Sequence, residues 1–442
     1  MRKESVVLIN PPDPLPSYIY PTNRPPYDLL YIESLLHDHG VGVKYLDIHN
    51  QKIGRAEYCS LFAEMAAFYY VINTTGHHHD FRSYRVRRQH QKKEVEVQQI
   101  IREIKDFSPD SLIILVGETA RVYPEEYADC GVDCILVDEP EYAMLEVLKK
   151  NVRRREELQE MRGGNYRSGN TFIRNDLRNT LRTLDELIPP RWDLLGGYFW
   201  DSVFRERREY IDLVGMRGCP HACSFCKSAL SKKVLYHSPR YLLTQIELLF
   251  REFGYTDFFF RGAGYFDDRQ RAKEMCEGLR RLEGITWKCN ARVDHAERPV
   301  LKMMKSSGCS LVAYGVESVN QKTLEYVHKE IDIRTVVNAV TSAKEEDLKV
   351  AAYFILGLPF EGLLGQLRTI IFAVRSGIDL LYFNRYFSLF SDIGDKHTRV
   401  KDTWKRFVAC AFLVIVSFLS KNKRVYYSKI RLGTFLPKRN TF

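Results

Sequence analysis

The chain has 442 residues, of which 45% are hydrophobic and 12% aromatic, a composition typical of globular proteins and not of disordered ones. At this length we expect two or three domains, each with a sizeable core. The net charge of +10 lies entirely in residues 399–442, which hold eleven Lys or Arg and one acid. Because the rest of the chain is neutral, the sequence predicts no nucleic-acid partner.

The first residues are basic, but the apolar run that follows covers only Val6 to Ile9. This run is too short for a secretory signal, so we expect a cytoplasmic protein. The ten cysteines are scattered except for one group of three. Such spacing indicates reduced thiols in a large protein and not a disulfide framework.

The first third of the chain alternates between strand and helix patterns. The predicted strands cover residues 5–10, 41–48, 68–76, 111–118 and 132–140, and the predicted helices cover residues 27–40, 95–107 and 141–151. This alternation predicts an α/β fold with a parallel, doubly wound sheet, a Rossmann-like domain of the flavodoxin-like kind. Ligands of such sheets bind at the carboxyl ends of the strands. The candidate binding residues there are Asn10, Pro11, Pro12, Thr74 and Gly117.

A second series of strands and helices begins near residue 210. A polar stretch over residues 151–180 separates it from the first series and predicts a linker. Six strand-like segments follow, the first leading into the cysteine group and the others covering residues 256–262, 285–294, 309–318, 349–359 and 379–387. Six strands separated by helices predict an incomplete β/α barrel, whose chemistry is expected at the carboxyl ends of its strands.

The cysteine group follows the first of these strands. Cys219, Cys223 and Cys226 form the pattern C-x-x-x-C-x-x-C, with Phe225 just before the last cysteine. A small structural zinc site is one interpretation, but zinc normally takes four ligands and no fourth is obvious nearby. A [4Fe–4S] cluster offers the other interpretation, since three thiolates bind three of its irons and leave the fourth open.

The spacing and its context resemble the radical S-adenosylmethionine (SAM) superfamily. The stretches WKCNARVD, GVESVNQKTLEYVHK and VAAYFILGLPFE resemble successive barrel strands of that superfamily. The resemblance implies that the open iron binds SAM and that one electron cleaves it to a 5′-deoxyadenosyl radical. It also implies a SAM site at Glu317, Arg292 and Phe225, with Gly357 and Pro359 lining the adenosine. A barrel salt bridge is the alternative role for Glu317 and Arg292. Where relatives often have an acidic pair after the second strand, this chain has Gly262-Ala263-Gly264, with Asp267-Asp268 slightly later.

The first domain resembles the cobalamin-binding domain fused to many radical SAM enzymes. The resemblance lies in the residues that follow the predicted strands, beginning NPPDPLP and LVGETARVYPEEY. It implies a cobalamin site at the strand ends given above. The chain then divides into a cobalamin-binding-type domain (1–150), a linker or bridge (151–204), a partial (β/α)6 radical SAM barrel (205–395) and a basic tail with a short apolar helix (396–442).

Three other features receive ordinary interpretations. His49 lies in a stretch whose spacing differs from the loop that places histidine on cobalt, and we interpret it as a loop residue. Residues 77–79 are consecutive histidines, which splay apart in an extended chain and rarely bind one ion. The apolar run 407–419, as a helix, would be about 20 Å long, short of the hydrocarbon core. Its basic flanks would suit peripheral contact with an anionic membrane, and a packed helix is the alternative.

The leading functional hypothesis is a radical SAM enzyme with a [4Fe–4S] cluster and SAM. With cobalamin bound, it would be a C-methyltransferase acting on a small-molecule or lipid substrate. An electron donor such as flavodoxin or ferredoxin would be its partner. The alternatives are radical cyclisation or rearrangement without methyl transfer, and a non-catalytic, metal-stabilised binding protein.

Overall fold

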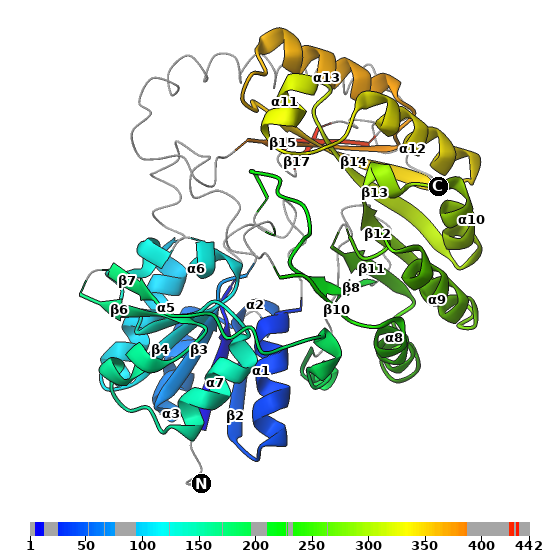
Figure 1. Cartoon of the computed structure of the whole chain (residues 1–442). Coiled ribbons are helices and arrows are strands. Elements are labelled where there is room, and N and C mark those ends of the chain that lie inside the picture. Colours follow the sequence, from blue (N-terminus) through cyan, green and yellow to red (C-terminus); the bar gives the residue numbers. More distant parts are fainter. Residues whose placement is uncertain are drawn as a thin grey trace, which may run out of the picture. The chain divides into compact units, whose positions relative to one another are not determined.

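The computed structural model describes residues 5–12, 25–51, 53–65, 67–75, 94–122, 124–169, 171–195, 210–226, 228, 233–262, 264–386, 424–427 and 430–432. The chain divides into two compact units, Met1–Arg207 and Arg208–Phe442. Each unit contains its own sheet (Figure 1).

The sheet of the first unit has seven strands in the order β2-β1-β3-β4-β5-β6-β7. Its parallel strands are β1 (Ser5–Asn10), β2 (Gly42–Asp47), β3 (Tyr69–Asn73), β4 (Leu112–Val116) and β5 (Cys134–Leu136). The order 2-1-3-4-5 is that of flavodoxin-like folds, and the strand order reverses between β1 and β3. The predicted fold class of this unit is confirmed.

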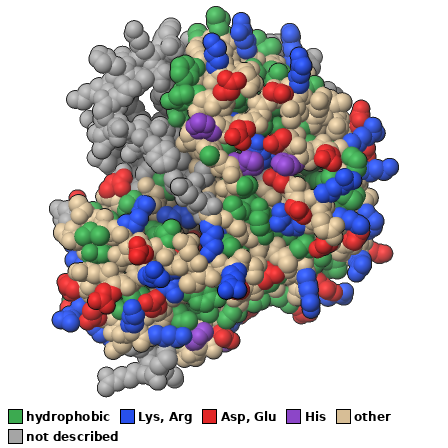
Figure 2. Space-filling model, in the orientation of Figure 1, with side chains coloured by type: hydrophobic (Ala, Val, Ile, Leu, Met, Phe, Trp, Pro, Cys, Tyr) green, Lys and Arg blue, Asp and Glu red, His purple; other side chains and the backbone are tan. Residues whose placement is uncertain are grey.

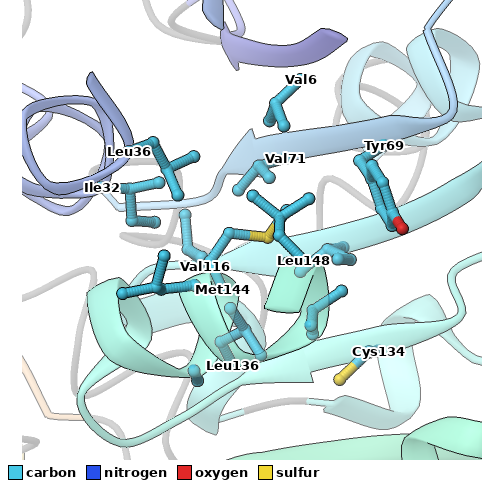
Figure 3. Packing of buried hydrophobic residues seen from close by; sticks show 14 of the residues in the cluster. Val6, Ile32, Leu36, Tyr69, Val71, Val116, Cys134, Leu136, Met144 and Leu148 are labelled. Carbon is cyan, nitrogen blue, oxygen red and sulfur yellow. The ribbon is translucent and has the colours of Figure 1, made fainter. Parts of the chain in front are cut away.

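Helices cover both faces of this sheet. They are α1 (Tyr27–Asp38), α2 (Ile48–Gln51), α3 (Arg55–Met65), α5 (Glu94–Phe107), α6 (Glu118–Val122) and α7 (Pro140–Lys149). Short 3₁₀ helices lie at Pro124–Tyr127, Arg155–Glu160, Leu184–Glu186 and Trp192–Leu195. Figure 3 shows one of the two cores, in which side chains of α1 and α7 pack on alternate residues of the strands, for example Ile32 and Met144 near Val71. Alternate strand residues, such as Val7 and Ile72, pack in the core on the opposite face.

The stretch predicted as a linker contributes to this sheet. Strands β6 (Gly164–Ser168) and β7 (Thr171–Arg174) form an antiparallel hairpin that pairs with β5 through residues such as Tyr166 and Cys134. The hairpin lies at the edge of the sheet, and β7 is mostly exposed. An exposed edge strand needs little apolar sequence, which is why its composition resembles that of a linker.

The second unit is built on one eight-stranded sheet with the order β17-β16-β15-β14-β13-β12-β11-β8. The six predicted strands are β8 (Tyr210–Val214), β11 (Asp257–Arg261), β12 (Thr286–Ala291), β13 (Cys309–Glu317), β14 (Lys349–Leu356) and β15 (Leu380–Arg385). All six run parallel to their neighbours, and β8 at one end does not pair with β17 at the other. The sheet is therefore an incomplete barrel, as predicted.

Two strands were not predicted. β16 (Arg424–Tyr427) pairs parallel to β15, and β17 (Ile430–Leu432) pairs antiparallel to β16. Part of the basic tail therefore extends the barrel sheet. The apolar run 407–419, predicted as a short helix, lies outside the described residues, as do His77 to His79. Among the helices that the structure describes, none is long and apolar enough to cross a membrane.

Helices pack against the outer face of this sheet (Figure 1). They are α8 (Pro239–Phe253), α9 (Arg269–Arg280), α10 (Arg298–Ser306), α11 (Gln321–Tyr326), α12 (Ile333–Glu345) and α13 (Leu363–Arg375). Sequence signals define α8 well: Ser238 accepts a hydrogen bond from the amide of Tyr241, Pro239 begins the helix, and Gly254 ends it in the left-handed conformation. Figure 2 shows acidic and basic side chains interspersed over the visible face, in keeping with a neutral protein body.

Candidate functional site

The three cysteines lie on an irregular loop at the carboxyl side of β8. A short strand, β9 (Met216–Arg217), precedes the loop and pairs with β10 (Leu235–Tyr236) after it. Cys223 is buried, whereas Cys219 and Cys226 are half-buried, and all three are free thiols. The amide of Cys226 donates to the carbonyl of Cys223 at 3.0 Å, which folds the second half of the loop into a tight turn.

The loop is attached to the segment that follows α11. The amide of Ser224 donates to the carbonyl of Val327 at 3.0 Å. Two cations near this contact, Lys329 and Arg292, act on the thiol of Cys223. Burial raises the pKa of Cys223, and the two cations oppose that rise. Cationic surroundings favour a thiolate, the form that binds iron.

Glu317 and Lys329 form a buried ion pair next to the cysteine loop. Glu317 ends β13 with a φ of +66°, and its Oε1 lies 3.2 Å from Lys329 Nζ. A Cβ on Gly315 would lie 2.6 Å from Glu317 Oε1 and 2.9 Å from Lys329 Nζ, so a larger residue there would displace the ends of these two side chains. Burial raises the pKa of Glu317, and Lys329 and then Arg292 oppose the rise.

Arg292 follows β12 and is 4% exposed. Its guanidinium contacts both carboxylate oxygens of Asp294, at 2.9 Å through Nε and 2.8 Å through a terminal nitrogen. A terminal nitrogen also donates to the carbonyl of Lys329 at 3.3 Å. Both Glu317 and Arg292 therefore form salt bridges, which was the alternative role for them. Glu317 pairs with Lys329 and Arg292 pairs with Asp294.

The loop after β14 contains the other predicted SAM residues. Gly357 has a φ of +85°, and the carbonyl of Pro359 accepts a hydrogen bond from the hydroxyl of Thr323 at 3.0 Å. Glu361 is buried and accepts hydrogen bonds from Ser318 at 2.7 Å and from Thr369 at 2.9 Å. Because Ser318 follows Glu317 directly, these contacts attach the loop to the Glu317–Lys329 pair. Phe225 lies on the cysteine loop and is half-buried.

The sequence analysis missed Lys329, and it named Asp267 without assigning it a role. Lys329 lies twelve residues after Glu317, within a stretch that matched the superfamily, and its position there was the available signal. Asp267 follows β11, and its Oδ2 lies 3.8 Å from His295 Nε2. Burial raises the pKa of Asp267 to about 6, although His295 and Arg292 oppose the rise.

In the first unit, three polar side chains meet at the carboxyl ends of neighbouring strands. Asn10 of β1 donates to Asp47 of β2 at 3.0 Å and accepts from Asn73 of β3 at 3.0 Å. All three are buried. The chain of amides and carboxylate fixes the geometry of the edge where the strand order reverses, which is the usual ligand position in such sheets.

The predicted residues at this edge have different surroundings. Pro11 is buried and Pro12 is half-buried. Thr74 is completely buried, and its hydroxyl donates to the carbonyl of Val116 at 2.7 Å and accepts from the amide of Ala120 at 3.1 Å. Both hydrogen bonds of its hydroxyl are therefore made to the backbone of this unit. His49 lies in α2.

Gly117 has a φ of +102°, and a Cβ there would lie 2.5 Å from the hydroxyl oxygen of Thr75. The ends of β3 and β4 therefore approach each other closely at a position that only glycine tolerates.

The barrel sequence matches a known family. Residues 213–363 match the family model described as the radical SAM superfamily, and the match includes the cysteine loop, Arg292, Glu317 and Gly357. This part of the chain is a radical SAM domain. Among curated relatives, an uncharacterised methyltransferase of Pyrococcus horikoshii is 27% identical over 285 residues, which are 63% of this chain and 61% of the relative. An anaerobic magnesium-protoporphyrin IX monomethyl ester cyclase of Rubrivivax gelatinosus is 26% identical over 310 residues, 66% of this chain and 55% of the relative.

The fold of the radical SAM domain and the unit before it also occurs in solved structures. The methyltransferase TsrM from Kitasatospora setae, with cobalamin and a [4Fe–4S] cluster bound, matches 87% of this chain and 75% of its own with a TM-score of 0.69 and 15% identity. The cobalamin-dependent radical enzyme OxsB matches 89% of this chain and 54% of its own with a TM-score of 0.68 and 18% identity. This chain thus spans about three fifths or less of the length of the two curated relatives described here.

Proposed function

We propose that the chain is a radical SAM enzyme whose [4Fe–4S] cluster is held by Cys219, Cys223 and Cys226. The observation that carries the proposal is the three-cysteine loop within a matched radical SAM domain, at the carboxyl edge of a partial barrel. Within the described ranges, no three His, Cys, Asp or Glu side chains are arranged to hold a single metal ion. The donor set of three thiols on one loop, beside two buried cations, fits a cluster in which each thiolate binds a different iron.

When bound, the cluster supplies the electron that cleaves SAM reductively. The protein residues orient the SAM molecule. Lys329 and Arg292 are the two buried cations at the cysteine loop, and we assign them to the SAM carboxylate. Glu317 lies at the same site, and we assign it to the SAM molecule as well. The Gly357–Pro359 loop and Phe225 would line the adenosine.

We further propose that the first unit binds cobalamin at the edge where β1, β3 and β4 end. When bound, cobalamin would carry the methyl group that is transferred. Supporting observations are the order of the strands, the fixed polar edge of Asn10 and Asn73, and the close approach at Gly117. Pro11 and Pro12 border the same edge. TsrM, whose fold this chain shares, was solved with cobalamin bound.

The proposed reaction is methyl transfer to a small molecule, with flavodoxin or ferredoxin as electron donor. The relative from P. horikoshii carries a methyltransferase name and is 27% identical. Ring-forming radical chemistry is the second candidate, since the relative from R. gelatinosus is named a cyclase. Cobalt content tests the cobalamin-dependent candidate: protein purified with added cobalamin should retain about one cobalt per chain, and protein that retains none would contradict cobalamin-dependent methyl transfer.

The radical SAM assignment is tested on anaerobically reconstituted full-length protein. We expect about four irons and four sulfides per chain, and reductive formation of 5′-deoxyadenosine and methionine from SAM. The triple variant Cys219→Ala, Cys223→Ala, Cys226→Ala should lose both iron and SAM cleavage. The matched control Cys130→Ala, Cys134→Ala, Cys309→Ala removes three cysteines outside the loop and should keep the iron. Retention of iron and of SAM cleavage in the first variant would refute the assignment.

A further inference from the structure

The side chains inside the barrel of the second unit form a polar layer that the SAM site does not use. Trp287 of β12 donates its indole N–H to the carbonyl of Ser307 at the end of α10, so it faces the outer helices. Phe260 of β11 packs edge-on against Trp287 at 5.5 Å and therefore also faces outward. Because side chains alternate along a strand, Arg261 and Asn290 face the inside of the barrel.

Arg261 ends β11 inside the barrel, and its orientation is fixed. Its Nε donates to Asp212 Oδ2 at 2.9 Å, and its guanidinium lies 4.1 Å from the centre of the Phe259 ring. Asp212 is 1% exposed, whereas the side chain of Arg261 is 23% exposed. Within the described residues, Arg261 makes one hydrogen bond, from Nε to Asp212. Its two terminal amino groups are therefore available to a ligand.

The opposite wall of this layer is aromatic. Tyr353 of β14 faces the same interior, because Asn290 pairs with Ala313, Ala313 pairs with Ala351, and Tyr353 lies two residues further along that strand. Two strands, β12 and β13, separate β14 from β11 in the sheet, so Tyr353 belongs to the far wall of the interior as seen from Arg261. Tyr353 stacks on Tyr382 of β15 with ring centres 5.1 Å apart, and Tyr353 is half-buried.

Asn290 adds an unused polar atom to the layer. The pairing of Phe260 with Cys289 places Asn290 next to Arg261 on the neighbouring strand. Its Oδ1 is buried and, in the part of the chain that the structure describes, has no hydrogen-bond partner. A buried amide oxygen without a partner costs free energy, so this position favours a ligand that brings a donor.

The layer below is closed. Lys288 Nζ lies 2.5 Å from Asp257 Oδ2 and 5.3 Å from the centre of the Tyr210 ring. All three residues are buried. Arg261 and Asn290 therefore form the deepest partly exposed layer of the barrel interior in the described residues.

We propose that Arg261 and Asn290, facing Tyr353, bind an oxyanion group of the substrate, a carboxylate or phosphate attached to a flat ring. This inference rests on the proposed function, since it names the substrate class for the radical SAM site. Arg261 presents the planar donor fork that matches two oxyanion oxygens, and Asp212 holds that fork in place. The stacked tyrosines offer a flat apolar surface to the ring.

The test uses full-length reconstituted protein with saturating SAM, so that Lys329 and Arg292 are occupied. Isothermal titration calorimetry compares phenyl phosphate, benzoate, neutral benzamide and cationic benzylamine. We expect phenyl phosphate or benzoate to bind at least tenfold more tightly than benzamide and benzylamine. The double variant Arg261→Gln, Asp212→Asn should weaken binding of the anion at least tenfold. It removes both charges together and so leaves no unpaired carboxylate.

The matched control is the double variant Arg298→Gln, Glu346→Gln. It removes an Arg–carboxylate pair on the outside of the barrel, in which Nε and Oε1 are 2.7 Å apart. This variant should bind the anion like the wild type. The proposal is overturned if the wild type binds neither anion, if it binds benzamide equally well, or if the Arg261 variant binds the anion unchanged. Titration of SAM alone separates the two hypotheses. Absent SAM binding contradicts the proposed function, whereas SAM binding without anion binding contradicts only the substrate class. Thermal unfolding of each variant verifies that it is folded.

Discussion

Replacing Lys329 by methionine removes one partner of the buried pair with Glu317. The two side chains are 10% and 8% exposed, and Nζ lies 3.2 Å from Oε1. Methionine fills a similar volume without the charge. The variant therefore leaves the Glu317 carboxylate in a low-dielectric site, with Arg292 as the remaining nearby cation that opposes the rise in its pKa.

The loss of stability should depend on pH. Breaking a buried pair by removing one partner costs about 3–5 kcal/mol when the remaining charge stays ionised. Burial already raises the pKa of Glu317 above the ordinary value of 4.5, and loss of Lys329 should raise it further. The folded variant then holds its proton at pH values where the unfolded chain has lost it. Its stability should therefore fall as pH rises from 4.5 through the raised pKa, and remain low above it. The difference from the wild type should be smaller at pH 5 than at pH 8.

The measurement has to report on the second unit alone, because the chain has two units. Cys289 and Cys309 are buried in that unit, at 0% and 2% exposure. Their reactivity with a thiol reagent in increasing urea, read by mass spectrometry of the peptides, gives the free energy of unfolding of this unit. The double variant Glu317→Gln, Lys329→Met should recover most of the loss, since it removes both charges. Equal losses at pH 5 and pH 8, or no recovery in the double variant, would refute the reasoning.

Two further predictions concern other positions. Gly117→Ala should destabilise the first unit by more than about 1 kcal/mol, since φ is +102° and the new Cβ would lie 2.5 Å from the Thr75 hydroxyl. Urea unfolding measures this loss, and Gly54→Ala, with no atom within 4 Å, is the matched control and should change little. Asp267 has a pKa raised to about 6 from 3.8, so the folded state binds its proton more tightly and stability should fall between pH 4 and pH 6. Asp267→Asn should remove that decline, and an unchanged pH profile in this variant would contradict the prediction.

Most of the fold could be predicted because its signals are local. Strand β1 has the predicted bounds, and the strand patterns of the barrel stand out because parallel strands are apolar over several residues. β6 and β7 could not be identified this way. Their residues, such as Asn165 and Arg174, alternate little in polarity, and the pairing with β5 forms over about 30 residues of sequence. β16 and β17 were missed because residues 396–442 were interpreted as a basic tail with a short apolar helix.

The cysteine loop could be recognised in the sequence because its three cysteines lie within eight residues. The cations around it come from separate elements, Arg292 after β12 and Lys329 after α11, and only the folded sheet brings them to Cys223. Nothing in the local sequence of Lys329 shows that its amino group is buried. The room for that group depends on Gly315 and on the left-handed backbone of Glu317, and these are properties of a bulged strand end.

The same reasoning applies to the inside of the barrel. Arg261 and Tyr353 are 92 residues apart in the sequence, and only the folded parallel sheet places both on the same interior face. Around the cysteine loop the polar groups pair with each other, as Glu317 does with Lys329. In the interior layer, Asn290 Oδ1 is buried without a partner among the described residues. Buried groups without partners cost stability unless a ligand satisfies them. The interior layer is therefore where we expect the identity of the substrate to be determined, whereas the edge above it is the proposed site of the cofactor chemistry.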